Sequence, residues 1–295
     1  MTRKTKMRIR HFSIICFCII IMFSAVSCNS EIKNNKLTIV TSFYPVYITT
    51  LNIADNISDI EVINLTPITT GCLHDYQLTA ADIKTLNNAD VFIANGADME
   101  PFISKIISQC PDLKIVYASD GIDLIDNNPH TWLSTENYTT YINNITNGLS
   151  TISKEHSSKF SSNREKYISD ILTLKNEISS SLEGISQRDI VVFNDTMTYF
   201  AKENNLNILK SLDLEHDESL SPQELTETID IINKSNCNAL FAEPDYSSSA
   251  INTISTETGK RVYIFDPVTR GHDSDKTAYI TSMRKNALSL AEALK

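Results

Sequence analysis

The stretch KFSSNREKYISDILTLKNEISSSLE, residues 159–183, decides how the chain is organised. It contains neither proline nor glycine, and its apolar side chains recur at the spacing of one helix face: Tyr167, Ile168, Ile171, Leu172, Leu174, Ile178 and Leu182. One long helix is therefore predicted over 159–183, after a shorter helix over about 135–152. Because no strand pattern occurs between 135 and 183, this helical region should separate two halves of the fold.

Short apolar runs rich in β-branched residues lie on both sides of this helical region. Most of them are continuous rather than alternating, which is typical of parallel strands covered on both faces. The predicted strands are 37–43, 60–65, 90–95 and 114–118 in the first half, and 189–193, 207–211, 239–243 and 261–265 in the second.

Helix-capping patterns lie between the predicted strands. Thr79-Ala80-Ala81-Asp82 should open a helix to about Asn88, and Ser221-Pro222-Gln223-Glu224 is a stronger capping box. A further helix should start at Ser248 or Ser249 and stop at Gly259. Strands that alternate with helices indicate an α/β fold.

The expected fold has two lobes, each a mostly parallel sheet flanked by helices, joined by one long rigid helix. The N-terminal lobe is expected over 37–155, the linking helix over 156–185 and the C-terminal lobe over 186–295.

The start of the chain has the pattern of an export signal. Residues 1–11 are basic, and residues 12–26 form an apolar run too short for a comfortable membrane span. The segment Ala25-Val26-Ser27-Cys28 resembles a bacterial lipobox, with Ala25 where leucine is commonest. We expect a signal peptide over 1–27, a lipid on Cys28 and a polar tether over 28–36, which would anchor the protein to the outer face of the cell membrane. The alternative is an ordinary signal with an incidental cysteine.

Removal of the signal makes the chain more acidic. Residues 1–27 hold five of the 26 basic residues and none of the 36 acidic ones, so the remainder has a formal charge of −15. This charge argues against nucleic acid as a partner and mildly favours cations as ligands. The spacing of Cys72, Cys110 and Cys237 matches neither a disulfide framework nor a zinc knuckle, so buried thiols are favoured over a single disulfide.

Polar side chains follow several of the predicted strands, at the edge where open parallel sheets bind ligands. They are His74, His130, Asn194, Asp195, Glu243 and Asp266. Imidazole and carboxylate together suit a borderline divalent metal such as zinc or manganese. Taken singly, each residue has the alternative of an ordinary solvated loop or turn position.

Several sequence blocks resemble the zinc/manganese-binding family of solute-binding lipoproteins of ABC transporters, the cluster A-I type. The blocks run in the family's order from about residue 38 to 294. They are VTSFYPVY (40–47), HDYQLTAADIKTLNNADVFIANGADMEPFISKI (74–106), NPHTWLS (128–134), NDTMTYFAKENNL (194–206), LSPQELTETIDII (220–232), LFAEPDYSSSAINTISTETG (240–259) and FDPV (265–268).

The resemblance implies a metal ion held between two lobes by ligands from four places. Carried over by motif, these ligands are His74, His130, Asn194 and Asp266. Asn194 is the main departure, because the family normally has histidine there, or glutamate in its manganese-binding members. An amide oxygen is a weaker and harder donor than imidazole, so the site should bind zinc less tightly than its relatives and lean somewhat toward manganese.

Three arrangements of the third ligand stay open, in this order: Asn194 with a water, Asp195, and His216. Cys72 is a further candidate as a thiolate, but a buried thiol is the favoured interpretation. Glu243 is expected to support the site by hydrogen bonding. Tyr44 and Trp132 are expected to line the metal site without contacting the ion.

The function that the resemblance implies is that of a monomeric extracytoplasmic substrate-binding protein. It would capture zinc, or alternatively manganese, and deliver it to an ABC permease and its ATPase, with no catalytic step. One alternative is a metal-binding surface lipoprotein with a sensor or adhesin role, which the change at Asn194 motivates. The other is a zinc hydrolase with Glu243 as base, although the chain contains no HExxH motif.

Overall fold

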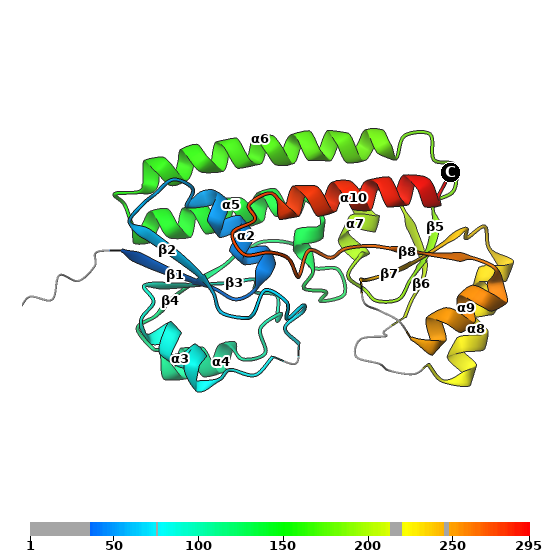
Figure 1. Cartoon of the computed structure of the whole chain (residues 1–295), viewed down its shortest axis with the longest axis horizontal. Helices are drawn as coiled ribbons and strands as arrows, with labels where there is room; N and C mark the ends of the chain where they lie inside the picture. The colour runs from blue at the N-terminus through cyan, green and yellow to red at the C-terminus, as the bar shows by residue number, and fades with distance from the viewer. Residues whose placement is uncertain (1–35, 75, 213–219, 245–247) are drawn as a thin grey trace, which may run out of the picture. The chain divides into compact units, whose positions relative to one another are not determined.

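Two four-stranded parallel sheets form the framework of the computed structural model, which describes residues 36–74, 76–212, 220–244 and 248–295 (Figure 1). The first sheet has the order β2-β1-β3-β4, and the second has the order β6-β5-β7-β8. Their strands are β1 Leu37–Thr41, β2 Ile60–Asn64, β3 Val91–Ala94, β4 Lys114–Tyr117, β5 Asp189–Val192, β6 Asn207–Ser211, β7 Ala239–Ala242 and β8 Arg261–Ile264. Each lies inside a predicted range, and the predicted α/β class with parallel sheets is confirmed.

The burial of the strands explains their continuous apolar runs. The inner strands β3 and β7 are buried along their whole length, because helices cover both faces of the sheet. The edge strands β4 and β8 are buried less, with exposed residues at both ends. The loops that follow the carboxyl ends of the inner strands therefore start from strands that are held in a packed core.

The helices that the sequence predicted are α3 Ala80–Asn87, α5 Thr135–Ile152, α6 Ser157–Ser181, α8 Pro222–Lys234 and α9 Ser249–Thr258. Both capping boxes form, at Thr79 with Asp82 and at Ser221 with Glu224. Gly259 ends α9 in the left-handed conformation, with φ +66°.

Further helices were not predicted: α2 Tyr44–Ile53, α4 Ile103–Gln109, α7 Thr198–Glu203, α10 Ala278–Ala293 and the short 3-10 turn η1 Thr131–Leu133. The α2 helix is buried on nearly every side, so its sequence lacks the amphipathic period that marks a surface helix. The α4 and α7 helices are too short to show a clear period.

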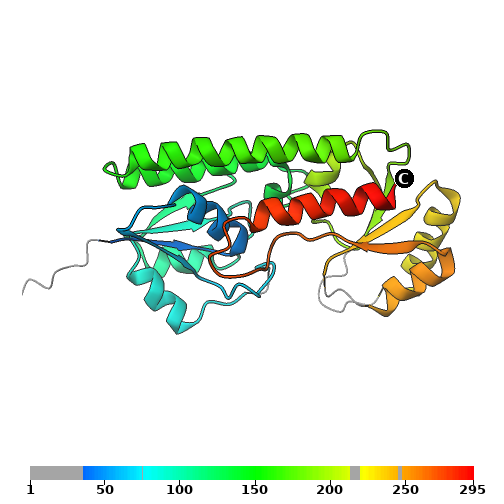
Figure 2. The same cartoon turned by 45° about the horizontal axis from the view of Figure 1, so that its top comes forward.

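A second connection accompanies the long helix between the two sheets. After β8 the chain reaches the first sheet's side, where the Gly271 backbone N–H donates to Ile68 O at 3.2 Å and Tyr47 Oη donates to Asp273 Oδ1 at 2.6 Å. The chain then returns as α10, which lies beside α6 in Figures 1 and 2, and Arg284 pairs with Glu177 at 2.8 Å. Residues 37–295 accordingly form one compact unit.

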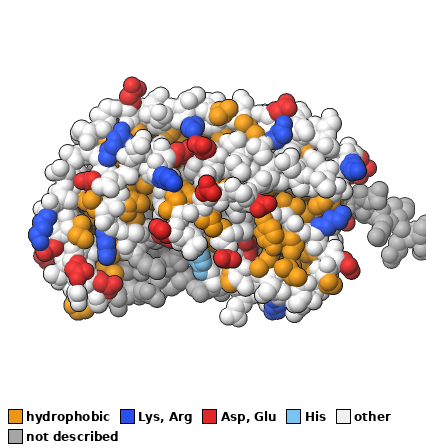
Figure 3. All heavy atoms as spheres, turned by 180° about the vertical axis from the view of Figure 1, so that it is seen from behind, with side chains coloured by type: hydrophobic (Ala, Val, Ile, Leu, Met, Phe, Trp, Pro, Cys, Tyr) orange, Lys and Arg blue, Asp and Glu red, His pale blue; other side chains and the backbone are white. Residues whose placement is uncertain are grey.

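The described surface carries interspersed charges and a few large apolar side chains. On the face in Figure 3, acidic and basic side chains alternate, with hydrophobic side chains gathered between them. The most exposed large apolar residues are Ile107, Tyr117, Leu124, Leu172, Ile264 and Leu288. None of the described helices is both long and apolar enough to cross a membrane.

Candidate metal centre

Two predicted ligands, His74 and His130, lie next to each other. His74 is in the loop between β2 and α3, and His130 is in the loop between β4 and η1. Their ring centroids are 5.9 Å apart with an angle of 65° between the ring planes. His74 is exposed, whereas His130 is 1% exposed. One ring of the pair is thus accessible to solvent while the other is held inside the protein.

The orientation of His130 is fixed by Asn128. The Asn128 amide oxygen accepts hydrogen bonds from the His130 backbone N–H at 2.8 Å and from its Nδ1 at 2.9 Å. Since Nδ1 must carry the hydrogen in this arrangement, Nε2 is left with a lone pair and is the nitrogen that can bind a metal. The tautomer is inferred from these partners.

Burial also keeps the His130 ring neutral. Desolvation, followed by the repulsion of a charge on His74, lowers the pKa of His130 to about 3. Neutral imidazole is the form that binds metal ions, so the site is prepared for a cation at neutral pH.

Trp132 packs beside His130 and links the histidine loop to the chain around Asp266. The two rings lie 5.3 Å apart between centroids, and Trp132 Nε1 donates to Pro267 O at 2.8 Å. Tyr44 lies near this segment as well, since its hydroxyl donates to His272 O at 2.9 Å. Both residues therefore pack around the histidine and aspartate loops.

Cys72 lies beside the metal-binding nitrogen of His130. Its Sγ is 3.5 Å from His130 Nε2, and the residue is half-buried. The favoured interpretation of the three cysteines as buried thiols holds for Cys110 and Cys237 but is wrong for Cys72. The sequence offered Cys72 as a candidate thiolate but could not predict its contact with His130, because 58 residues separate the two partners.

Asn194 follows β5 and is 5% exposed. Its Nδ2 donates to Glu243 Oε1, and its Oδ1 accepts from Thr196 Oγ1 at 2.7 Å. The amide oxygen retains a second lone pair, so it can still act as a weak donor to a cation. Glu243, which directly follows β7, thus engages the residue proposed as the third ligand.

Asp266 follows β8 and is held by both backbone and side-chain contacts. Its Oδ1 accepts from the Val268 backbone N–H at 2.8 Å, and its own backbone N–H donates to Asn286 Oδ1 at 2.8 Å. Asp266 and Glu243 line one cavity of about 230 Å³, together with Pro244, Pro267, Thr269, Arg270 and Gly271.

Of the two alternative third ligands, the structure describes Asp195 but not His216. Asp195 has a side chain that is 53% exposed, and its Oδ1 lies 3.5 Å from His130 Nδ1. That is the nitrogen that carries hydrogen, so Asp195 contacts the imidazole on the side away from the metal-binding lone pair. His216, like the proposed lipidation site Cys28, lies outside the described residues.

The ligands are not gathered around one point. Within the parts of the chain that the structure describes, no three His, Cys, Asp or Glu side chains lie close enough together to hold a metal ion as they stand. The two histidines are adjacent, whereas Asp266 and Asn194 belong to the loops of the second sheet. Capture of an ion by all four would require side chains or loops to move together.

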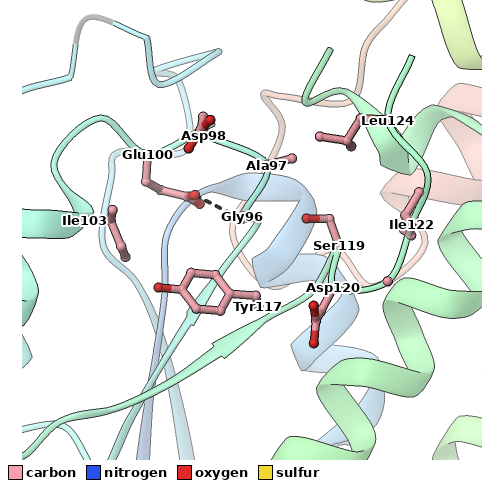
Figure 4. A pocket seen from close by; sticks show the side chains of 11 residues that line it. Gly96, Ala97, Asp98, Glu100, Ile103, Tyr117, Ser119, Asp120, Ile122 and Leu124 are labelled. Atoms are coloured by element: carbon pink, nitrogen blue, oxygen red, sulfur yellow. Dashed lines mark hydrogen bonds between the residues drawn. The ribbon is translucent and has the colours of Figure 1, made fainter. Parts of the chain in front are cut away.

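A buried acidic residue, Glu100, supports the histidine loop through Asn95. Its oxygens accept from the backbone N–H group of Asn95 at 2.6 Å and from that of Gly96 at 3.0 Å. Figure 4 shows the contact with Gly96. Asn95 in turn donates from its Nδ2 to Pro129 O at 3.1 Å, one residue before His130. Burial raises the pKa of Glu100 to about 7, although interactions with the Ser42 side chain and with backbone N–H groups act in the opposite direction. Sequence analysis missed this residue, because no motif marks a carboxylate that binds mainly backbone N–H groups.

The fold and the paired histidines together define a metal-binding solute-binding protein of the two-sheet α/β kind. Solved structures share this fold: the Zn(II)-bound ZnuA-like domain of Streptococcus pneumoniae AdcA aligns with a TM-score of 0.76 and 25% identity, covering 88% of this chain and 99% of that one. The solute-binding protein FpvC of Pseudomonas aeruginosa, solved in complex with Mn²⁺, has the same fold with a TM-score of 0.79.

The family model described as the periplasmic component A of the zinc-uptake complex, ZnuA, matches residues 39–293, and the chain belongs to that family. Among curated relatives, the manganese-binding lipoprotein MntA of Halalkalibacterium halodurans is 25% identical over 290 residues, which cover 92% of this chain and 96% of that protein. The predicted relationship to metal-binding solute-binding proteins is therefore confirmed.

Proposed function

We propose that this protein is the extracytoplasmic receptor of a metal uptake system, which binds zinc, or alternatively manganese, and passes it to an ABC permease and its ATPase. Family membership supports this role. The observation that carries it is the histidine pair. The buried His130 is neutral and has Nε2 available for a metal, and its ring centroid lies 5.9 Å from that of His74.

The proposed ligands are His74, His130, Asn194 and Asp266. The first two form a partial site on the first sheet, and the other two follow β5 and β8 of the second. A cation would draw the two sets together, and the same movement in reverse would release it at the permease. Glu243 supports Asn194 through a hydrogen bond, and no covalent step is needed.

The arrangement of the whole chain follows from the same proposal. Residues 1–27 are a signal peptide, Cys28 carries a lipid, and 28–36 form the tether. Lobes over 37–155 and 186–295 are connected by the linking helix over 156–185, and the protein acts as a monomer on the outer face of the membrane. A covalent lipid gives membrane affinity without a spanning helix.

The direct test is calorimetry with zinc and manganese on the mature chain and on its His74→Ala variant. We expect His74→Ala to abolish high-affinity binding, because His130 would be the only imidazole left in the proposed ligand set. His156→Ala is the matched control, since His156 is engaged by Asp59 at 2.9 Å and by Ser153 at 2.7 Å, outside the proposed ligand set. Equal metal affinity in wild type and His74→Ala would contradict the proposed site.

A further inference from the structure

We infer that Cys72 binds the same metal ion as His74 and His130, as a thiolate, and that it makes the site selective for zinc over manganese. The inference rests on the proposed function. It adds a ligand that compensates for the neutral amide at Asn194, where a third imidazole would be a much stronger donor to zinc.

The first argument is the separation between Cys72 Sγ and His130 Nε2, which is 3.5 Å. Two ligands of one tetrahedral zinc ion, with a Zn–S distance near 2.3 Å and a Zn–N distance near 2.0–2.1 Å, lie about 3.6 Å apart. The sulfur and the nitrogen are thus already spaced as neighbouring ligands of one ion. His74, whose ring centroid is 5.9 Å from that of His130, would have to move to complete the set. His130 can use Nε2 for this purpose because Asn128 occupies Nδ1.

The second argument is the way the loop holds Cys72 in place. The neighbours Gly71 and Leu73 are both buried, and Leu73 is completely enclosed in the core. Gly71 has φ +84°, and an added Cβ would lie 3.1 Å from Arg270 Nε, so the backbone there is closely packed. Anchored on both sides, Cys72 turns its side chain toward His130, and His74 follows two residues later.

Without metal, the same contact is a thiol that donates a weak hydrogen bond to the imidazole nitrogen. Binding of zinc replaces this bond: the S–H bond breaks, the proton leaves to solvent, and sulfur and nitrogen each give a lone pair to the metal. No oxidant or reductant takes part. Thiolate is a soft ligand, which favours zinc strongly and manganese hardly at all.

The test uses cobalt(II), which occupies zinc sites and reports on sulfur ligands by a thiolate-to-metal charge-transfer band in the near ultraviolet. We expect the mature wild-type chain to show this band on binding one equivalent of cobalt. The band should vanish in Cys72→Ser and persist in Cys110→Ser, whose cysteine is buried at the end of α4.

Competition with a zinc chelator gives the second measurement. We expect Cys72→Ser to lower zinc affinity by at least about 100-fold, because loss of a residue that only supports a ligand already costs about 10–100-fold. Manganese affinity should change by less than about threefold. In the wild-type chain zinc should protect one thiol from an alkylating reagent, and this protection should disappear in Cys72→Ser. Circular dichroism and thermal melting establish that the variant is folded.

Two outcomes separate this inference from the proposed function. If the wild-type chain binds cobalt or zinc without the charge-transfer band, or if Cys72→Ser keeps its full zinc affinity, Cys72 is not a ligand, while the receptor role stands. If the wild-type chain binds neither cobalt, nor zinc, nor manganese, both this inference and the proposed function are wrong.

Discussion

At position 194 an amide stands where the family resemblance of the sequence implies a stronger ligand, and its surroundings show what a replacement would meet. Glu243 Oε1 accepts a hydrogen bond from Asn194 Nδ2, and Thr196 Oγ1 donates one to Asn194 Oδ1 at 2.7 Å. A histidine at this position would find Glu243 ready to accept from one ring nitrogen, which would orient the other nitrogen toward a metal. Carboxylate–histidine–metal arrangements of this kind raise the basicity of the ligand and fix its ring.

We therefore expect Asn194→His to increase zinc affinity by at least about tenfold, because imidazole is a stronger zinc ligand than an amide oxygen. Asn194→Ala is the control for loss of the side chain and should weaken binding. Chelator competition on the three proteins measures the effect. An unchanged zinc affinity in Asn194→His would show that position 194 does not contact the ion.

At the scale of single elements, the loop after β3 shows how backbone contacts shape the site. Glu100 binds the N–H groups at the end of β3, and the Asn95 side chain reaches Pro129 beside His130. The pKa of Glu100 is raised from its ordinary value of 4.5 to about 7, mainly by burial. The raised pKa means that the folded protein favours the protonated carboxyl over the ionised one. The contribution of this group to the free energy of unfolding is therefore present at low pH and is lost as pH rises from about 4.5 toward 7.

The expected result is that the free energy of unfolding of wild type falls relative to Glu100→Gln by roughly 2 kcal/mol between pH 5 and pH 8. Glutamine has a similar shape and does not ionise, so the difference isolates the titration. Urea unfolding of both proteins at several pH values provides the measurement. A difference that stays constant with pH would mean that the pKa of Glu100 is not raised.

At the scale of the whole molecule, the segment between β8 and α10 ties the two sheets together. Tyr44 Oη donates to His272 O at 2.9 Å and accepts from the His272 backbone N–H at 3.0 Å. Gly271 passes directly against this ring, since an added Cβ would lie 2.1 Å from Tyr44 Oη. The second connection therefore depends on a residue without a side chain.

Gly271→Ala should destabilise the protein by about 2 kcal/mol, as overpacking of a filled interior does. In a Tyr44→Ala background the same substitution should have a much smaller effect, because the clashing ring is gone. A double-mutant cycle from urea unfolding measures this coupling. Additive effects of the two substitutions would show that the close approach has no energetic consequence.

The sequence by itself determined the eight strands, the long α6 helix and the capped helices α3, α8 and α9, because these depend on local apolar runs and on residues next to one another in the chain. It also identified His74, His130, Asn194 and Asp266 as candidates, through motifs and the position of each after a strand. The strand orders and the uniformly buried α2 were not predictable, since both depend on packing between distant segments.

Only the tertiary structure decided which candidates meet. It placed His74 and His130 together, brought Cys72 to His130 across 58 residues, and put Asp195 on the other nitrogen of that ring. It also revealed the return of the chain through Gly271, which makes the link between the two sheets double. These contacts arise from where loops end after folding, and no local pattern in the sequence records that.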